Sequence, residues 1–501
     1  MQAEDMTGRR TALYFLFALL AAGVMLLPHW PGLIDLPGHV ARYHVELALS
    51  QSPLLQRYYD FTWMVVPNLG VDLLIYPLAK LIGLEPAARV IVAAIPALTI
   101  IGMLALAKVA HGRINPLALM TVPCAFGYPF TFGFVNYCLS AALAFCAAAI
   151  WVRLIQADRP VSRTLFGVLA SPVLLIAHLM GWGLFGLIAF GSLFAASRER
   201  GIVRAAVHAG IACIPLAWPL IILALAQPHN PGVNIGWFSL LGVLKWSAVM
   251  LRERWMVVDI GSAMVLFAVA GLPLLLWRRF AYELVLFIPA VLTWVAIIVM
   301  PMQLLGSAFA NVRLVPAALA LSILAVRPLK PLPRFVEPAV MLFVLARLAI
   351  TASALLAFDV KATRQLSALK VMTPGSRVLG FAMQRCTRTW APPRSQNLQL
   401  LATARRDVLI NSHFTEAGAQ LLTIRFPAAP GLMHFGSSSI ITLKCWRSSY
   451  PTLREALTAS PIKAFDYLWL LDVPAAQLPH DPELKPIWRA SDSIVYAIRR
   501  S

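Results

Sequence analysis

Between Ile114 and Val152 the chain reads INPLALMTVPCAFGYPFTFGFVNYCLSAALAFCAAAIWV, 39 residues without an Asp, Glu, Lys, Arg or His. A membrane-spanning helix needs about 20 mostly apolar residues, because lipid offers no partner for an unpaired backbone N–H or C=O group. The stretch is therefore long enough for two passes. We expect the turn between them near residues 127–133, where Gly, Pro and aromatic residues replace the aliphatic run.

The rest of the chain has a similar composition. Of its 501 residues, 59% are hydrophobic and 13% are charged, and the mean hydropathy is +0.75. About a quarter of an average soluble domain is charged, and this much apolar surface cannot be buried inside one globule. The composition excludes a single soluble domain and predicts an α-helical polytopic membrane protein with about eleven transmembrane helices. The expected spans are 11–27, 90–107, two within 114–152, two within 164–197 that turn near 178–181, 205–227, 260–276, 284–302, 314–326 and 338–358.

The basic residues indicate the orientation. The chain contains 42 Lys and Arg against 22 Asp and Glu, a net charge of +20. Short cytoplasmic loops of membrane proteins carry an excess of Lys and Arg. Counted from a cytoplasmic N-terminus, the short inner segments hold 15 Lys and Arg and the longer outer segments hold 7. We expect a cytoplasmic N-terminus, large outer loops at 28–86 and 228–259, and an outer C-terminal tail, although one helix more or fewer would move the tail.

From Asp359 onward the composition changes, with 18 Lys and Arg against 9 Asp and Glu. We therefore divide the chain into a transmembrane domain, 1–358, and a C-terminal domain, 359–501. A solvated surface is favoured for this basic tail over contact with anionic lipid or glycan. Helical patterns separate short β-like runs, which predicts a small α/β domain with strands at 376–381, 407–410, 466–471 and 493–498.

Two of the six cysteines, Cys386 and Cys445, lie in the tail. A disulfide between them is compatible with an outer location, and the sequence leaves the pairing open. The other four lie in predicted spans and are expected to be small core residues. The chain contains no CxxC or HExxH spacing, no GxxxxGK loop and no GxSxG elbow. ATP-driven transport and serine hydrolysis therefore lack support.

The first outer loop carries the candidate chemistry. Its residues 30–48 read WPGLIDLPGHVARYHVELA, with an acid, two histidines and an arginine close to a membrane exit. Asp35 is either a general base beside an apolar wall or the N-cap of the helix that follows. On that helix, basic residues three apart share a face and suit a phosphate ligand. The candidates for binding substrate here are His39, Arg42 and His44.

Polar residues of other outer segments are further candidates. Residues 237–255 predict an interfacial helix with a basic face, for which a plain membrane anchor is favoured over phosphate binding. His178, at a predicted outer turn, is equally compatible with ligand binding and with a satisfied buried histidine. The basic residues of the interfacial segment are Lys245, Arg252 and Arg254.

Three more charged residues have structural explanations. Arg347 falls near the middle of the last predicted span, where an unpaired charge is expensive. We therefore expect it to pair inside the bundle or to extend toward the membrane surface. Asp72 and Arg89 flank a short apolar half-helix and are candidates to pair with each other.

Several motifs of the N-terminal region follow one another in a fixed order. An acid-containing loop precedes an apolar half-helix that ends in Gly83, then Ala-Ala-Arg89 opens a span that exits at Lys-Val-Ala-His-Gly112. This order resembles the C-type (GT-C) integral-membrane glycosyltransferases, which include protein O-mannosyltransferases, lipid A aminoarabinose transferases and oligosaccharyltransferases. The resemblance is best over residues 11–153. Two later segments also resemble the superfamily pattern, His178-Leu-Met-Gly181 and Asn311-Val-Arg313-Leu-Val-Pro316.

The resemblance implies a reaction. Such enzymes take a sugar from a polyprenyl-phosphate carrier at the outer membrane face and transfer it with inversion to a glycan, lipid or protein acceptor. It implies that Asp35 acts at the acceptor, as a base or as part of the acceptor or metal site. It also implies that Arg313 binds the carrier phosphate, because a fixed guanidinium stabilises the charge of a phosphate leaving group. The expected location is a bacterial cytoplasmic (inner) membrane, with the C-terminal domain periplasmic.

One departure from the superfamily pattern concerns the second outer loop, where many members have another acid. Here residues 127–138 contain none and offer only Tyr128, Thr131, Asn136 and Tyr137. This departure weighs against a bound divalent metal, although the question of metal binding stays open. The sequence identifies no other cofactor.

Two alternatives to a transferase remain. One is a non-catalytic assembly factor that keeps the fold, which the missing acid supports. The other is a membrane transporter, although we find no internal repeat and most polar residues gather in outer loops. Membrane lipids are expected partners. Nucleic acid is not an expected partner, because most of the Lys and Arg residues lie either in the predicted cytoplasmic loops or in the C-terminal tail.

Overall fold

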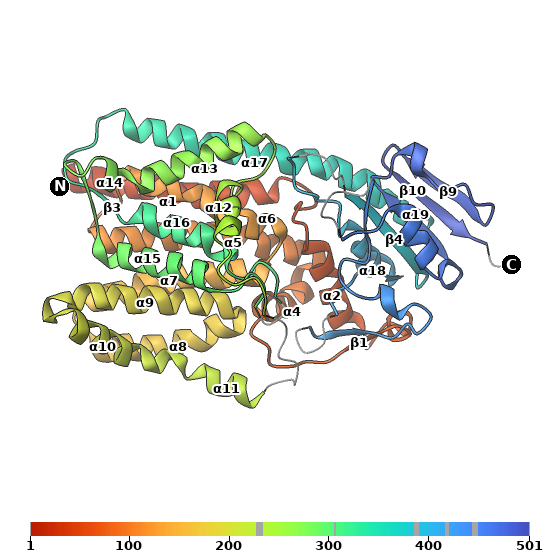
Figure 1. The fold of residues 1–501 in the computed structure, drawn as a ribbon, viewed down its shortest axis with the longest axis horizontal. Coiled ribbons are helices and arrows are strands. Elements are labelled where there is room, and N and C mark those ends of the chain that lie inside the picture. The colour runs from red at the N-terminus through yellow and green to blue at the C-terminus, as the bar shows by residue number, and fades with distance from the viewer. Residues whose placement is uncertain are drawn as a thin grey trace.

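The computed structural model of the protein describes residues 2–226, 234–304, 307–384, 390–415, 420–442 and 449–499. Most helices run side by side in one bundle, with the N-terminus at one end and the C-terminal strands beyond the other (Figure 1). The bundle contains α1 (Gln2–Leu26), α5 (Leu84–His111), η1 (Pro116–Phe126), α7 (Val135–Gln156), α8 (Pro160–Ala177), α9 (Leu179–Ser197), η2 (Arg198–Arg200), α10 (Ile202–Cys213), η3 (Ile214–Ala217), α11 (Pro219–Leu225), α12 (Leu240–Ala248), α13 (Met256–Ala270), α14 (Leu272–Leu275), α15 (Leu284–Val299), η4 (Val312–Leu314), α16 (Val315–Leu324) and α17 (Val336–Leu366).

The prediction of a mostly helical chain with several apolar helices of membrane-spanning length is confirmed, while the count of eleven spans stays a prediction. In the described part of the chain, five helices are long and apolar enough to cross a membrane: Leu84–His111, Val135–Gln156, Pro160–Ala177, Leu179–Arg200 and Val336–Val371. The pair Ile202–Ala217 and Pro219–Leu225, bent by 46°, makes a sixth if it is one span. Shorter apolar helices occupy four more predicted spans: Arg10–Leu26, Met256–Ala270, Leu284–Val299 and Val312–Leu324.

The charge-free stretch 114–152 folds as two helices that meet near the predicted turn, but the first is not an α-helix. Residues Pro116–Phe126 form the 3-10 helix η1, with Pro123 inside it. Proline lacks the N–H that an α-helix needs and crowds the preceding turn, which disfavours regular α geometry here. Because a 3-10 helix rises about 2.0 Å per residue, this segment covers roughly 22 Å despite its short length. The short helix α6 (Tyr128–Phe132) then leads into α7.

The C-terminal residues form a mixed sheet flanked by short helices, as predicted for an α/β domain. Strand β4 (Arg377–Gln384) pairs in parallel with β5 (Leu409–Ile410), β7 (Ser439–Ile441) and β8 (Tyr467–Leu471). Strand β10 (Ser493–Ile498) runs antiparallel to β8 and to β9 (Leu484–Ala490). The four predicted strands correspond to β4, β5, β8 and β10. The helices are η5 (Ser367–Val371), η6 (Leu398–Leu400), α18 (Leu401–Arg406), η7 (Pro430–Leu432), α19 (Leu453–Ala459), η8 (Ile462–Ala464) and η9 (Ala475–Gln477).

The two faces of this sheet contribute to different cores. In β8, Leu468 and Leu470 pack in the core of the C-terminal domain. Trp469 and Leu471 belong to the core that continues into the helical bundle. Successive side chains of a strand point to opposite faces, so burial on both sides explains the unbroken apolar run in β8.

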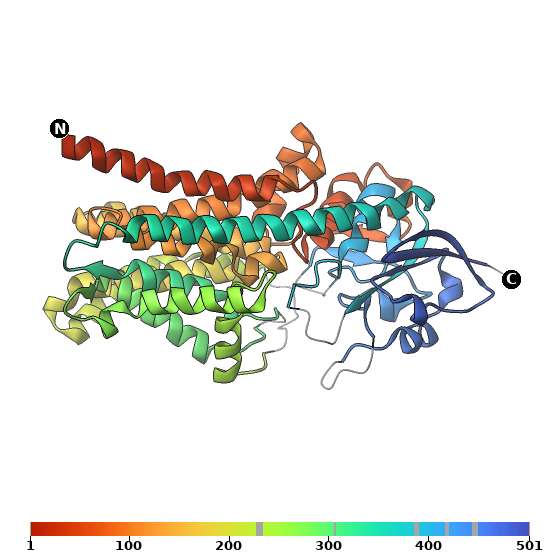
Figure 2. The same ribbon diagram turned by 90° about the horizontal axis from the view of Figure 1, so that it is seen from above.

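The first outer loop lies between the bundle and the C-terminal domain. It contains α2 (Leu36–Ala48), α3 (Pro53–Gln56), β1 (Tyr59–Phe61) and α4 (Gly70–Ile82). Strand β1 pairs antiparallel with β6 (Leu422–Ile424) of the C-terminal residues. Helix α17 runs without a break from the bundle to the C-terminal sheet (Figure 2) and crosses the predicted domain boundary at 358/359. The boundary stays a prediction.

Four cysteines, Cys124, Cys138, Cys146 and Cys213, are free and buried or half-buried, in agreement with the expected core role. The predicted disulfide partners Cys386 and Cys445 lie outside the described residues. Strands β2 (Phe280–Tyr282) and β3 (Val326–Pro328) form a short two-stranded antiparallel sheet at the N-terminal end of the bundle. Helices α15 and α16 lie between these strands in the sequence.

Candidate functional site

Asp35 lies at the N-cap position of α2, yet its carboxylate makes no cap hydrogen bond to that helix. Instead Asn397 Nδ2 donates to Asp35 Oδ1 at 2.9 Å. The backbone around it is fixed by the second outer segment, because Ile34 N donates to Thr131 O at 3.1 Å and Asp35 N donates to Phe132 O at 2.8 Å. The residue is only 7% exposed. Its carboxylate is therefore held by contacts other than helix capping.

Gly133 makes this close approach of the two outer segments sterically feasible. It has a φ of +91°, a conformation that L side chains rarely adopt. A Cβ at this position would lie 3.0 Å from Asp35 N and 3.3 Å from Asp35 Cβ. A side chain here would strain the backbone and displace Asp35.

Arg313 contacts the same segment. Its guanidinium carbon is 3.9 Å from the centre of the Phe134 ring, one residue after Gly133. Arg313 Nη2 donates to Ala308 O at 2.7 Å, and Tyr137 Oη donates to Arg313 O at 2.8 Å. The arginine is buried, so both its backbone and its side chain are held in place.

Two hydrogen-bonding groups near Arg313 lack partners. Among the described residues, neither Arg313 Nε nor the hydroxyl of Tyr128 has one, and both atoms are buried. Arg313 also lines a small cavity together with Gly127, Tyr137 and Pro316. Buried polar groups are normally paired, so a cation beside unused donors suits an anionic group. Asp35 is close enough for its charge to act on Arg313.

Arg42 makes a buried ion pair instead of lying open to a ligand. Its Nη2 is 2.6 Å from Asp72 Oδ1, and the two side chains are 2% and 0% exposed. Its Nη1 donates to Gln420 Oε1 at 2.9 Å. The predicted pairing of Asp72 with Arg89 is wrong, because Arg89 Nη2 donates to two carbonyls at the end of α1. In the folded chain Arg42, and not Arg89, is the ion-pair partner of Asp72.

The two histidines of α2 have different surroundings. His39 is buried and stacks on Phe414 at 5.2 Å between ring centres. Burial, assisted by the charge of Arg42, lowers the pKa of His39 to about 3, so its ring is neutral. His44 Nε2 lies 2.7 Å from Asp407 Oδ1, facing the C-terminal domain.

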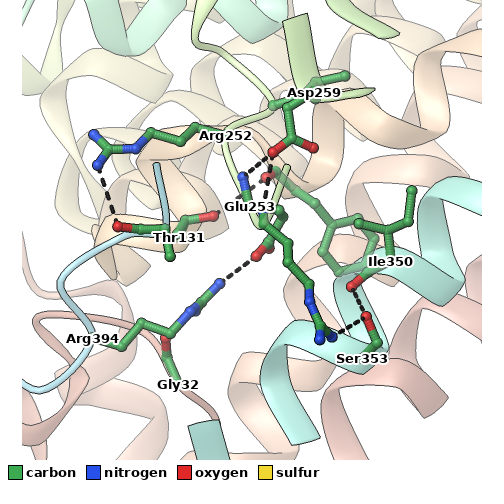
Figure 3. Close-up of polar contacts among 12 residues, drawn as sticks. Gly32, Thr131, Arg252, Glu253, Asp259, Ile350, Ser353 and Arg394 are labelled. Atoms are coloured by element: carbon green, nitrogen blue, oxygen red, sulfur yellow. Dashed lines mark hydrogen bonds and ion pairs between the residues drawn. The ribbon is translucent and has the colours of Figure 1, made fainter. Parts of the chain in front are cut away.

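Three other predicted substrate-binding residues, His178, Lys245 and Arg252, differ in their surroundings. His178 Nδ1 accepts from Met180 N at 3.1 Å and caps α9, which agrees with the satisfied-histidine alternative. Lys245 is exposed on α12 and has no ion-pair partner in the described part of the chain. Arg252 Nε donates to Trp390 O in the tail. Figure 3 shows the Arg252 side chain pointing toward Thr131.

A segment of the tail, residues 390–397, covers this region. Arg394 Nη2 is 2.6 Å from Glu253 Oε2, and its Nη1 donates to Gly32 O (Figure 3). Both charged side chains are buried, at 6% and 4% exposure. Together with the bond from Asn397 to Asp35, these contacts join the tail to the predicted outer loops 28–86 and 228–259.

A second buried pair anchors the end of the predicted outer loop 228–259. Arg347 Nη1 is 2.7 Å from Asp259 Oδ1, which confirms the expectation that Arg347 pairs inside the protein. Asp259 Oδ2 accepts from the backbone N–H groups of Glu253 and Arg254 at 2.8 and 3.0 Å. The indole of Trp390 also donates to it at 2.6 Å. Asp259 therefore fixes the loop that presents Glu253.

Sequence reasoning did not identify Asn397, Arg394, Glu253 or Asp259 as site residues. Asp259 had one usable signal, because it is a lone acid at the start of an apolar run. The tail residues had none, since Asn397 is 362 positions from Asp35. The structure brings together Asp35, His39, Arg252 and Arg313 around the segment 128–134. It places Arg42 and His44 in ion pairs, His178 at the N-cap of α9 against the Tyr137 ring, and Lys245 on the exposed face of α12.

The described residues include no group of three or more His, Cys, Asp or Glu side chains able to hold a metal ion. The donor set near Asp35 consists of an amide and backbone groups, which do not form the oxygen cage that Mg²⁺ or Ca²⁺ prefers. We therefore derive no step through a metal.

This architecture, an apolar helical bundle with a buried acid and a buried arginine beside a C-terminal α/β domain, is shared with a solved structure. In particular, the chain is similar to the crystal structure of ArnT from Cupriavidus metallidurans bound to undecaprenyl phosphate. The TM-score is 0.51 at 14% sequence identity, and the match covers 97% of this chain and 98% of ArnT. At this identity the match establishes the fold. No protein-family model and no curated protein matches the sequence.

Proposed function

We propose that the protein is a glycosyltransferase that moves a sugar from a polyprenyl-phosphate carrier to an acceptor at the outer face of a bacterial cytoplasmic membrane. The observation that carries the proposal is that Asp35 and Arg313, both buried, contact the same short segment, 132–134. This arrangement lies in a fold shared with a protein solved with undecaprenyl phosphate.

The chemistry divides between these two residues. Asp35 takes the proton of the acceptor hydroxyl as that oxygen attacks the anomeric carbon, which inverts the configuration. The bond from the anomeric carbon to the carrier phosphate breaks, and the phosphate leaves with its bonding electrons. Arg313 stabilises the negative charge that develops on that phosphate, and the hydroxyl of Tyr128 supplies a further donor.

Asn397 is a positioning residue in this scheme. Its Nδ2 holds Asp35 Oδ1 at 2.9 Å, while its own Oδ1 is buried without a partner in the described part of the chain. The bond favours the ionised carboxylate and fixes its direction. Because Asp35 is buried under this contact, the acceptor hydroxyl must enter beside or in place of Asn397.

The proposal includes the topology expected from the sequence. The N-terminus and the C-terminal domain lie at opposite ends of the bundle (Figure 1), which supports a cytoplasmic N-terminus with a periplasmic C-terminal domain. A periplasm-active reporter fused after Ser501 should be active. Activity of a cytoplasmic reporter at that position would contradict the arrangement.

The test of function uses the full chain in proteoliposomes. Transfer is followed from a panel of undecaprenyl-phosphate-linked radiolabelled sugars to acceptors extracted from bacterial membranes. Asp35→Asn should lower transfer about 100-fold or more, the range expected for loss of a general base. Asp60→Asn is the matched control, because Asp60 belongs to the same loop but pairs at the surface with Arg425. Full activity of Asp35→Asn would exclude the catalytic role.

A non-catalytic protein with the same fold is the second candidate. The observation that favours it is the burial of Asp35 under Asn397, together with the absence of an acid in the second outer loop. Binding separates the two candidates from a misfolded preparation. If undecaprenyl phosphate stabilises the protein against heat and no sugar of the panel is transferred, the non-catalytic candidate is favoured.

A further inference from the structure

A second cleft lies apart from Asp35, between the start of α5, the end of α17 and the C-terminal helix α18. Its volume is about 780 Å³. One wall comes from residues 29–30, which follow α1, and another from residues 366–370 at the end of α17. Helices α1 and α17 lie side by side as they approach the C-terminal domain (Figure 2). We call this cleft the basic groove.

The charge of the basic groove is strongly positive. Four cations line it, Arg89, Lys370, Arg405 and Arg406, against one carboxylate, Glu85. Arg405 is engaged by that carboxylate through two contacts of 2.7 and 2.8 Å. Within the described part of the chain, the other three cations have no carboxylate partner. Three uncompensated positive charges around one cavity favour an anionic ligand.

Two buried donors in the groove are also unused. Trp30 is 3% exposed, and its Nε1 has no acceptor among the described residues. Its backbone N–H donates to Asp359 Oδ1 at 2.9 Å, which fixes its position. Arg89 uses Nη2 to hold the end of α1 but leaves its buried Nε without a partner in the same described part. Both N–H groups lie beneath the accessible surface of the groove, so an incoming ligand contacts the partly or fully exposed cations instead.

The chain segments that border the groove expose apolar side chains. Leu26 and Leu27, just before His29, are 44% and 57% exposed. Leu81 and Ile82, just before Glu85, are 79% and 46% exposed. In a membrane protein such side chains face acyl chains, and indole and basic groups gather at the level of the lipid head groups. The groove thus joins an anion-binding wall to a lipid-facing rim.

We propose that the basic groove binds the phosphate head group of an anionic membrane lipid, whose acyl chains lie along the exposed ends of α1 and α4. The phosphate is neutralised by Arg89, Lys370 and Arg406, which line the groove. This lipid site is separate from the residues around Asp35 and does not depend on the proposed transfer reaction.

The test measures lipid binding to the full-length protein in zwitterionic detergent micelles. A fluorescent phosphatidylglycerol is titrated and followed by fluorescence anisotropy, with unlabelled phosphatidylglycerol, phosphatidylcholine and inorganic phosphate as competitors. The charge-reversal pair Lys370→Glu/Arg406→Glu should weaken binding roughly tenfold or more. The pair Lys330→Glu/Arg334→Glu changes the net charge equally, on exposed residues of the turn before α17, and should bind as the parent does.

A milder variant guards against loss of folding. The pair Lys370→Gln/Arg406→Gln removes the two charges without reversing them, so it should weaken binding several-fold at an unchanged thermal midpoint. Saturable binding that phosphatidylglycerol displaces and phosphatidylcholine does not, together with these losses, supports the proposal. Unchanged binding by the groove variants overturns it. Displacement by inorganic phosphate at equal concentration also overturns it, since the ligand would then be a soluble anion.

Discussion

Replacing Arg394 with methionine should release the tail segment 390–397 from the outer loops. In the parent protein Arg394 Nη2 lies 2.6 Å from Glu253 Oε2, and both side chains are almost fully buried. Removing one member of such a pair costs about 3–5 kcal/mol, because the other charge stays buried without compensation. Methionine keeps the apolar stem of the arginine, so the loss reports mainly on the charge. We expect the free energy of local opening to fall by about 3 kcal/mol or more.

Hydrogen–deuterium exchange of the full-length protein measures this opening. A change of about 3 kcal/mol corresponds to roughly hundredfold faster amide exchange in the segment. Amides of α7 serve as the internal control and should be unaffected. The double variant Arg394→Met/Glu253→Met removes both charges and should return exchange to within about tenfold of the parent. The remaining deficit comes from the lost hydrogen bond to Gly32 O, worth about 1 kcal/mol.

The effect of Arg394→Met should also depend on pH. Burial raises the pKa of Glu253, and the charge of Arg394 opposes that rise. Without Arg394 the folded-state pKa lies further above its unfolded value. The penalty is absent below the unfolded-state pKa, where the carboxyl is protonated in both states, and grows as the pH rises from there to the folded-state pKa. The exchange ratio of variant to parent should be larger near pH 8 than near pH 5.5. Equal ratios, or equal acceleration in the single and double variants, would refute the reasoning.

Three further predictions concern the outer loops. Burial raises the pKa of Glu46 from 4.5 to about 8. The thermal midpoint of the parent protein should therefore fall as the pH rises from 4.5 to about 8, and Glu46→Gln should abolish that fall. A thermal midpoint of the parent that does not change with pH would contradict this prediction. Gly133→Ala should cost about 1–2 kcal/mol and at least tenfold in transfer, because its Cβ would meet Asp35 N at 3.0 Å. Gly112→Ala, at a φ of +72° with nothing within 4 Å, should cost similar stability and no activity; equal activity losses would rule out the Asp35 contact. Arg313→Ala should raise the KM for the carrier about tenfold or more and leave the KM for the acceptor nearly unchanged. Steady-state titration of each substrate measures both values. Equal rises in the two KM values would exclude a carrier-specific role.

Most of the helical fold was predictable because apolar runs in the sequence report directly on burial in lipid. The turns near 127–133 and 178–181 were also predictable, since Gly, Pro and His interrupt those runs. The geometry of the third predicted span was not. Its 3-10 form depends on Pro123 and on packing along its whole length, while hydropathy registers only that residues 116–126 are apolar.

The strands of the C-terminal domain were predictable where they are central and missed where they are at the edge. Strand β8 is buried on both faces and reads as a continuous apolar run. Strand β9 lies at the end of the sheet and contains Pro486, Lys485 and Arg489. Proline and basic residues are typical of edge strands, which must avoid pairing with other chains. The same property removes the alternation that identifies a strand from sequence.

The placement of buried charge bears on the choice between an enzyme and a transporter. Three ion pairs of the described residues are buried on both sides, and they join outer-loop residues to α4, to α17 and to the tail: Arg42–Asp72, Arg347–Asp259 and Arg394–Glu253. Burying such pairs costs desolvation, and their best-attested use is to select one arrangement of the chain. A transporter concentrates its ionisable residues on a path through the middle of the bundle. Here the charged pairs instead immobilise the loops that surround Asp35, an arrangement suited to holding a reacting group at one membrane face.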